Sequence, residues 1–396
     1  MSMTVEEKIK IFQDTAVKNI TKRFTDNDLF FGKKRVPDVP IICSSGSLSL
    51  DEALVVGGFP EGRVIEISGM ESCGKSTLTL LNIAEIQKNG KLCGYVDGEQ
   101  TFDPVYASKL GVDVDKLALY QTNVLEDALE VTLEYINSGV MSYIVIDSMN
   151  ALLAKRELDG EIGDASMGVR ALRWSQGLPK IVEACKRNNC TVVVISQIRS
   201  KIGVMFGSPE KIGIGESMKF NASIRIKVSK SDAEKNDESG QESVVIKANV
   251  FKNKVGVPFR KAEFTLLTGR LDKDGNPEYG IDVYNETLDY AVKYNYIKKA
   301  GAWYSYGDDK IGQGANSVIK WFKDNLDIYN KIRNDVYNTF LEANAKSKEG
   351  GMSSAIADAV ENNTKVKKRR GEPLVEVKAE EVVEAETVEE KSITLS

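Results

Sequence analysis

The 396-residue chain contains no histidine. This absence excludes Ser-His and Cys-His catalysis and zinc sites with histidine ligands, so any general base must be a carboxylate, lysine, cysteine or tyrosine. The five cysteines form no Cys-x-x-Cys pair. The sequence has neither an apolar leader nor a run of 18 apolar residues. We therefore expect a reduced, soluble, cytoplasmic protein with no membrane partner.

The net charge of the chain is slightly negative, at −5 at pH 7. A nucleic-acid-binding surface would therefore have to be a local basic patch. With 42% hydrophobic residues, the chain is rich enough in apolar side chains to build a sizeable core. Its length favours one large domain with smaller appendages.

Residues 69–76 read Gly-Met-Glu-Ser-Cys-Gly-Lys-Ser, the spacing of a phosphate-binding P-loop. An apolar run, 64–67, precedes the loop, and a helical pattern follows it, which is the context that this motif requires. Loop N–H groups would face the phosphates, Lys75 would reach the β/γ oxygens, and the Ser76 hydroxyl would hold Mg²⁺. The loop alone leaves ATP and GTP open. The nucleotide-binding residues predicted here are Gly69, Met70, Glu71, Ser72, Cys73, Gly74, Lys75, Ser76 and Thr77.

Short β-branched runs alternate with helical patterns from Ile41 to about Leu271. This alternation predicts an α/β core around a mainly parallel sheet flanked by helices. The predicted strands are Val64–Ile67, Leu92–Val96, Tyr143–Ile146, Thr191–Ile195, Ile224–Val228, Val244–Val250 and Glu263–Leu267.

Polar side chains follow several of these strands, at the sheet edge where α/β proteins bind ligands. Asp147 is placed to orient Mg²⁺ through a water molecule. Glu99 is our choice to polarise an attacking water, with Asp97 as its competitor. Gln197 could contact the γ-phosphate through its amide, although an ordinary polar strand end fits the spacing equally.

The two ends of the chain differ from the core. Residues 4–24 have an amphipathic helical pattern, which must pack on its own core or on a neighbouring subunit. Residues 301–306, Gly-Ala-Trp-Tyr-Ser-Tyr, suggest a short hairpin in a small α+β domain. A basic cluster and a glutamate-rich segment follow, typical of a disordered tail. The predicted domains are an N-terminal arm (1–37), the core (38–272), the α+β domain (273–345) and the tail (346–396).

Six blocks of sequence resemble the bacterial RecA recombinase family, in the same order and at nearly the same spacing over about residues 5–340. The blocks are the P-loop, Tyr-Val-Asp-Gly-Glu-Gln-Thr-Phe-Asp-Pro-Val-Tyr-Ala (95–107), Gly-Glu-Ile-Gly-Asp (160–164), Gln-Ile-Arg-Ser-Lys-Ile-Gly-Val-Met-Phe-Gly (197–207), Lys-Asn-Lys-Val-Gly-Val-Pro-Phe (252–259) and Lys-Ala-Gly-Ala-Trp-Tyr-Ser-Tyr (299–306).

The resemblance implies specific roles around the nucleotide. Glu99 matches the glutamate that activates water, and Gln197 matches the residue that links the γ-phosphate to the following DNA loop. Asp103 and Tyr106 match the pair that hydrogen-bonds and stacks on adenine, which favours ATP over GTP. The implied cofactors are ATP and Mg²⁺.

The resemblance also implies contacts with a neighbouring subunit and with DNA. Lys252 and Lys254 match lysines that reach the neighbour's ATP, in the manner of an arginine finger, and Phe220 matches a subunit-contact phenylalanine. Residues 160–168 and 198–215 match two DNA loops. The DNA-binding residues predicted on this basis are Met167, Gly168, Arg170, Arg173, Arg199, Ile202, Lys211 and Lys219, with Met167 and Ile202 wedging between base triplets.

The chain departs from the family pattern beside these loops. Leu172 and Pro179 stand where arginines are usual, and we expect Pro179 to interrupt a helix by removing one donor. Lys211 adds a charge in the second loop that could compensate. Together with the missing histidine, these changes favour a divergent copy carried by a phage or mobile element, although a host's housekeeping protein stays open.

The resemblance implies a DNA-dependent ATPase that forms helical filaments on single-stranded DNA and catalyses homologous pairing and strand exchange in recombination, DNA-damage repair and the SOS response. The implied partners are single-stranded DNA, a homologous duplex, further copies of the chain, a single-strand-binding protein and a self-cleaving repressor. Two alternatives are an ATP-binding filament scaffold and a ring helicase. The acidic tail would compete for the DNA-binding surface.

Overall fold

The computed structural model describes residues 3–12, 14–15, 39–161, 168–200, 210–212, 216–231, 243–271 and 275–349. Contacts divide the chain into two compact units, residues 1–40 and 41–396. In the first unit, helix α1 (Val5–Phe12) follows Thr4, whose hydroxyl accepts from the N–H of Glu7. Most of the remaining helix predicted over residues 4–24 lies outside the described residues.

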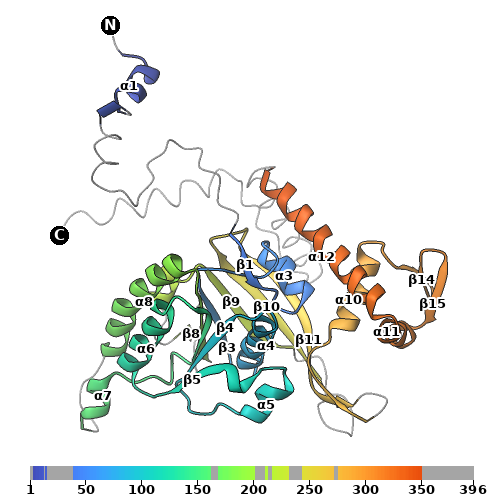
Figure 1. The fold of residues 1–396 in the computed structure, drawn as a ribbon, viewed down its shortest axis with the longest axis horizontal. Helices are drawn as coiled ribbons and strands as arrows, with labels where there is room; N and C mark the ends of the chain where they lie inside the picture. Colours follow the sequence, from blue (N-terminus) through green and yellow to red (C-terminus); the bar gives the residue numbers. More distant parts are fainter. Residues whose placement is uncertain are drawn as a thin grey trace, which may run out of the picture. The chain divides into compact units, whose positions relative to one another are not determined.

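The second unit is built on a ten-stranded sheet with the order β12-β11-β10-β9-β3-β7-β6-β4-β5, in which β8 pairs with β7 (Figure 1). The six strands from β9 to β5 are parallel, and β10, β11 and β12 extend the sheet antiparallel. This confirms the predicted α/β core with a mainly parallel sheet. The strands are β3 (Val64–Gly69), β4 (Leu92–Asp97), β5 (Leu117–Gln121), β6 (Met141–Asp147), β7 (Thr191–Ser200), β8 (Glu210–Ile212), β9 (Ile224–Lys230), β10 (Ser243–Asn253), β11 (Arg260–Leu271) and β12 (Pro277–Ile281).

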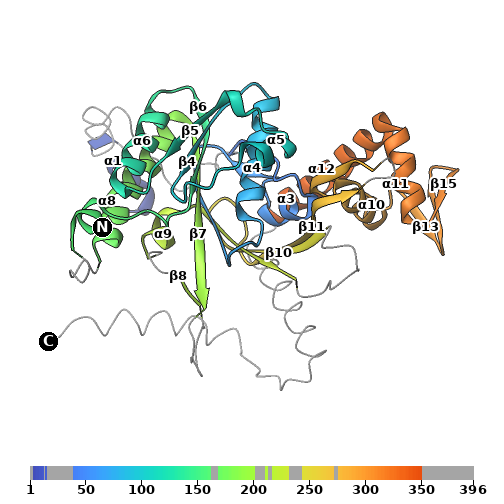
Figure 2. The same ribbon diagram turned by 90° about the horizontal axis from the view of Figure 1, so that it is seen from below.

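Helices cover both faces of the parallel strands, as a parallel sheet requires. On one face, Ile144 and Ile146 of β6 pack in a buried cluster with side chains of α6 (Leu125–Asn137) and α8 (Val169–Asn188). On the other, the Tyr143 hydroxyl donates to Asn82 of α4 (Lys75–Lys88). Figure 2 shows these two groups of helices separated by the strands. Alternate residues of β6 therefore face different helices, which explains why this strand is apolar at consecutive positions from Tyr143 to Ile146.

Helix α8 runs unbroken through Pro179, so the predicted interruption is wrong. Proline removes one donor and frees the carbonyl of the residue four positions earlier, Ser175. Both residues are exposed, so water can satisfy that carbonyl. The buried face of the helix, which includes Trp174 and Leu178, holds the segment against the sheet.

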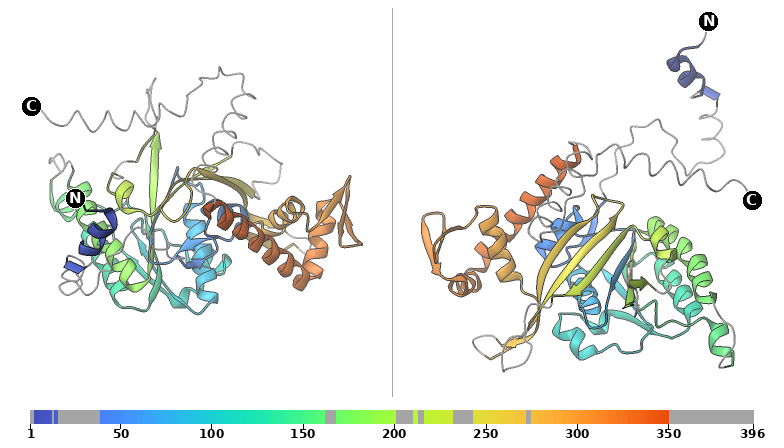
Figure 3. Two further views of the ribbon diagram at one scale, coloured as in Figure 1. Left: turned by 90° about the horizontal axis from the view of Figure 1, so that it is seen from above. Right: turned by 180° about the vertical axis from the view of Figure 1, so that it is seen from behind.

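The C-terminal part has a second hydrophobic cluster, which includes Leu288, Phe322 and Phe340. It comprises α10 (Val283–Lys293), α11 (Ala315–Asp324), α12 (Leu326–Glu349) and a sheet of β13 (Lys298–Ala300), β14 (Trp303–Tyr306) and β15 (Asp309–Gln313). Strands β13 and β14 form the predicted hairpin. Figure 3 shows this part, in orange and red, beside the antiparallel edge of the main sheet. The predicted boundary at residue 272 stays a prediction.

Helix α3 (Leu48–Leu54) packs against β10 and β11 of the main sheet and against α10 and α12 of the C-terminal part. Its Glu52 carboxylate accepts from Tyr290 and Tyr294 and pairs with Lys293 at 2.9 Å. The remaining elements are β1 (Ile41–Cys43), β2 (Phe59–Pro60), α5 (Pro104–Lys109), the 3₁₀ helix η2 (Val114–Lys116), α7 (Lys155–Asp159) and α9 (Glu216–Asn221). Within the described ranges, no helix has the length and apolar character to cross a bilayer.

Candidate nucleotide-binding site

The loop between β3 and α4 favours glycine at two positions, at Gly69 because of close packing and at Gly74 because of its backbone conformation. A Cβ on Gly69 would lie 2.5 Å from the Val228 carbonyl oxygen. Gly74 caps α4 with φ +83°, and a Cβ there would lie 2.7 Å from Leu266. The Lys75 ammonium donates to the Met70 carbonyl at 2.7 Å, across the loop. The loop therefore fits a phosphate chain at the helix N-terminus.

A carboxylate and two hydroxyl groups meet beside this loop. Asp147, at the end of β6, accepts from Ser76 at 2.6 Å and from Tyr95 at 2.7 Å, both through Oδ2. Burial raises the pKa of Asp147, while the two hydroxyl donors oppose that shift. Hard oxygen atoms of this kind are what Mg²⁺ prefers, so the pair of Ser76 and Asp147 suits a nucleotide-bound magnesium ion.

Glu99 lies at the same sheet edge, two residues beyond β4. Its Oε1 accepts from Ser148 and from the Gln197 side-chain amide, both at 2.7 Å. The strand register explains why these residues are close together. Gly69 is the parallel partner of Gln197, and Asp97 is the parallel partner of Asp147. The structure thus brings together Glu99, Gln197 and the P-loop, as the sequence predicts.

Asp97 is engaged in holding the turn after β4. Its carboxylate accepts from the Glu99 N–H at 3.2 Å, the Phe102 N–H at 2.9 Å and the Gln121 amide at 3.0 Å. The side chain is buried, whereas Glu99 is exposed. This difference favours Glu99 over Asp97 as the group that meets an attacking water.

The predicted adenine pair lies at the start of α5. Asp103 caps that helix, because its Oδ1 accepts from the N–H groups of Val105 at 2.8 Å and Tyr106 at 3.1 Å. The Tyr106 hydroxyl lies 3.0 Å from the Thr77 hydroxyl, in the first turn of α4. Tyr106 is thereby held next to the P-loop.

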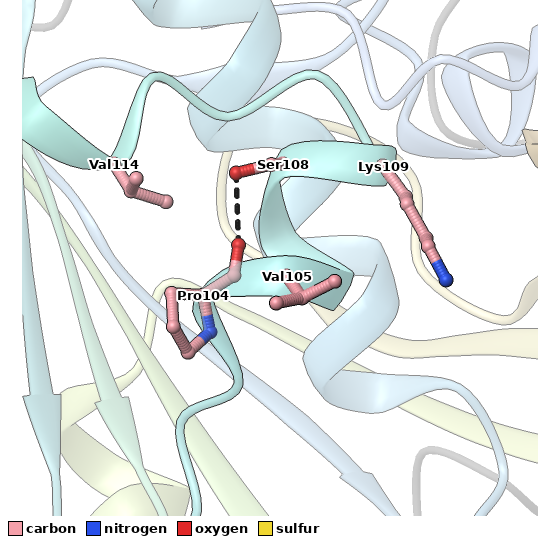
Figure 4. A pocket seen from close by; sticks show the side chains of 5 residues that line it. All are labelled: Pro104, Val105, Ser108, Lys109 and Val114. Carbon is pink, nitrogen blue, oxygen red and sulfur yellow. Dashed lines mark hydrogen bonds between the residues drawn. The ribbon is translucent and has the colours of Figure 1, made fainter.

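A surface pocket of about 510 Å³ lies along α5 (Figure 4). Pro104, Val105, Ser108 and Lys109 line it together with Val114, and Ser108 donates to the Pro104 carbonyl at 2.8 Å. None of its lining residues belongs to the P-loop or carries a carboxylate, so this pocket is distinct from the phosphate site.

Lys252 and Lys254 lie at the other end of the strands from the P-loop, where β3 and β9 begin. The Lys254 N–H donates to Ser223, whose N–H donates to Val64 at the start of β3. The P-loop begins five residues further along β3, which is about 16 Å at the usual strand rise. That span is longer than a lysine side chain, so neither ammonium group reaches the P-loop of its own chain.

The two lysines are gathered around a short exposed helix. Their ammonium groups donate to the carbonyls of Lys219 and Phe220 in α9, and the Phe220 side chain is 74% exposed. Burial and the neighbouring Lys254 lower the pKa of Lys252. An uncovered aromatic side chain beside two cations is suited to contact another molecule.

The predicted DNA-binding residues are only partly described. Gly168 caps α8 with φ +87°, and Arg170 pairs with Glu157 at 3.0 Å. Arg173 pairs with an acid of α6, and Lys219 pairs with an acid of α9. Arg199 and Lys211 are cross-strand partners of β7 and β8, but their side chains, like Met167 and Ile202, lie outside the described part.

Sequence reasoning missed three polar groups of this site. Tyr95 and Ser148 support the two carboxylates, and Asn150 accepts from the Gln197 N–H at 2.7 Å. Tyr95 could have been found from strand alternation, since it lies two residues before Asp97 on the same face. Ser148 and Asn150 carry no such signal.

Comparison with known proteins gives concordant matches. Residues 11–271 match the family model for the RecA N-terminal domain, and residues 285–341 match the model for the RecA C-terminal domain. Protein RecA of Acinetobacter baumannii is 44% identical over 339 residues, which cover 85% of this chain and 93% of the relative. Protein RecA of Mannheimia haemolytica is 42% identical over 329 residues, covering 82% of this chain and 86% of the relative.

Proposed function

This chain belongs to the RecA family, and from that premise we propose that it is a DNA-dependent ATPase that polymerises on single-stranded DNA and catalyses homologous pairing and strand exchange. The observation that carries the proposal is the contact between Glu99 and Gln197. It joins the P-loop side of the sheet to a strand, β7, that continues directly into the predicted DNA loop at residues 198–215.

The residues at the P-loop bind and orient ATP. Loop N–H groups and Lys75 hold the phosphates, and Thr77 holds Tyr106 beside the base site. Ser76 and Asp147 would hold Mg²⁺, which neutralises phosphate charge when bound. Glu99 accepts a proton from the attacking water, while Ser148 and Gln197 fix the orientation of its carboxylate.

Lys252 and Lys254 complete the site of a neighbouring copy. Since they cannot reach their own P-loop, cations at this end of the strands can stabilise transition-state charge only across an interface between subunits. The exposed Phe220 would belong to the same interface. Hydrolysis thereby depends on assembly, as expected for an ATP-dependent filament.

The γ-phosphate would act as a switch on DNA binding through Gln197. Its backbone is fixed by Asn150 and by the parallel register with Gly69, so only the side-chain amide is left to respond to the nucleotide. Arg199 follows two residues later on the same strand. The predicted DNA loop begins at the residue after Gln197, so a change in the position of the amide would act directly beside that loop.

We place this activity in the cytoplasm, with single-stranded DNA and a homologous duplex as partners. Base pairing supplies specificity, and the protein contacts mainly phosphates and stacked bases. A single-strand-binding protein and a self-cleaving repressor are further partners that membership of the family suggests.

Strand exchange between a circular single strand and a homologous linear duplex tests the proposal. We expect nicked circular product that requires ATP, and no product with Lys75→Ala protein, a matched control in the P-loop. ATP turnover with and without single-stranded DNA is measured in the same reactions. ATP-dependent filaments without strand exchange or stimulated turnover would favour the scaffold alternative and contradict the proposal.

A further inference from the structure

Tyr279 of β12 lies next to the predicted adenine-stacking residue, although nothing in the sequence connects the two. The ring centroids of Tyr106 and Tyr279 are 6.4 Å apart, and the rings meet edge to face at 84°. The Lys109 ammonium lies 5.2 Å from the Tyr279 centroid. We propose that Tyr279 is the second aromatic wall of the base site, an inference that rests on the proposed function.

The strand register places the Tyr279 side chain on this side of the sheet. Tyr279 is the cross-strand partner of Thr268 in β11, and cross-strand partners project from the same face. A bulge follows Thr268, where Gly269 has φ +121°, and a Cβ on Gly269 would lie 3.5 Å from the Tyr279 hydroxyl. The ring is therefore positioned against a backbone that only glycine forms easily.

The helix after the P-loop brings both tyrosines to the nucleotide. Thr77 of α4 contacts Tyr106. One turn later, the Leu81 side chain lies against β12, since a Cβ added to Gly280 would be 3.1 Å from it. Thr77 and Leu81 are four residues apart and share one face of the helix. Tyr106 and the residue after Tyr279 are thus fixed to the same face of α4, directly behind the phosphate loop.

Because the two rings stand at 84°, a base stacked on Tyr106 would meet the Tyr279 ring edge to face, a contact that every base permits. The half-buried Tyr279 ring and the cation of Lys109 beside it suit an electron-rich ring system. Tyr279 thus increases affinity for the base of a nucleoside triphosphate without selecting adenine over guanine. Its contribution is separable from that of the phosphate loop.

The experiment compares a nucleotide with a ligand that lacks the base. ATP carrying a fluorescent group on the ribose is titrated into full-length wild-type, Tyr279→Leu and Tyr279→Phe proteins, with inorganic tripolyphosphate and GTP as competitors. We expect Tyr279→Leu to weaken binding of ATP and GTP alike by roughly two- to tenfold, the scale of one edge-to-face aromatic contact. Tripolyphosphate affinity stays unchanged, and Tyr279→Phe binds like wild type.

Two matched variants separate the possible results. Tyr106→Leu tests the proposed base site itself, and Trp303→Leu removes an exposed aromatic side chain from the small sheet and should change nothing. If Tyr106→Leu weakens ATP binding but Tyr279→Leu does not, the inference is overturned while the proposed function stands. Equal weakening of ATP and tripolyphosphate by Tyr279→Leu also overturns it. Absence of ATP binding in wild type would overturn both.

Discussion

Replacing Glu99 with glutamine removes the proposed base and preserves almost all of its surroundings. Glu99 Oε1 accepts two hydrogen bonds, from Ser148 and Gln197, each at 2.7 Å. The carbonyl oxygen of a glutamine can accept both, so the orientation of the side chain and of Gln197 is retained. The amide cannot take a proton from water. We therefore expect intact binding and lost turnover.

The size of the loss follows from the role assigned to the carboxylate. A positioned general base contributes about 10²–10⁴-fold to the rate, which corresponds to a barrier change of about 3 to 5 kcal/mol. The hydrogen bonds retained by Glu99→Gln leave ATP affinity within about twofold, since neither neutral donor loses its acceptor. Turnover and binding should therefore separate clearly.

The assay is phosphate release at saturating ATP with single-stranded DNA, alongside ATP titration and thermal unfolding of each variant. Asp97→Asn is the comparison, because Asp97 anchors a turn through three donors. We expect it to lower Tm but to keep turnover in the folded fraction. Near-normal turnover by Glu99→Gln would refute the assignment, and loss of turnover by a stably folded Asp97→Asn would transfer the role to Asp97.

Three further perturbations have distinct expected results. Lys252→Ala and Lys254→Ala should abolish DNA-stimulated phosphate release but leave the ATP affinity of the isolated chain unchanged. Mixing either variant with Lys75→Ala protein should restore hydrolysis at those subunit junctions where an intact P-loop faces an intact pair of lysines. Burial raises the pKa of Asp51 to about 7, so the folded chain keeps a proton that the unfolded chain releases above about pH 4. Stability should therefore fall between about pH 4 and pH 7, by up to about 4 kcal/mol, and the Tm profile of Asp51→Asn should be flatter. Tyr95→Phe should raise the Mg²⁺ concentration needed for nucleotide binding by roughly tenfold, because Asp147 loses one of its two hydroxyl donors.

Each of these expectations can fail in its own way. Mixtures of the lysine variants with Lys75→Ala protein that stay inactive would show that the lysines do not act across an interface. Parallel Tm profiles for wild type and Asp51→Asn would show that Asp51 is ionised in the folded chain. An unchanged Mg²⁺ requirement in Tyr95→Phe, with unchanged Tm, would show that the tyrosine hydroxyl does not position Asp147.

The sequence alone was sufficient for the parts of this protein that depend on local patterns. The P-loop spacing, the apolar strands and the polar residues at their ends predicted an α/β core with Lys75, Ser76, Asp147, Glu99 and Gln197 at one edge. These predictions succeed because strand periodicity and glycine positions report the local backbone. The parallel order of the strands then brings their ends together without further information.

Other features were decided only by tertiary structure. Asp97 and Glu99 are two residues apart and chemically alike, and only the donors around Asp97 distinguish their roles. Pro179 breaks a local rule of helix formation, yet the packing of Trp174 and Leu178 holds α8 continuous. Local propensity is a weak term beside the burial of an apolar face.

The same holds for residues that are distant in sequence. Tyr106 and Tyr279 meet because β12 pairs with β11 and packs on α4. Lys252 and Lys254 are separated from their own P-loop because β10 runs antiparallel to β9, which returns them to the other end of the strands. Spacing along a chain does not encode which strands become neighbours, since that choice is made by the packing of the whole core. The sequence therefore determined which chemical groups this protein has, and the tertiary structure determined which of them act together.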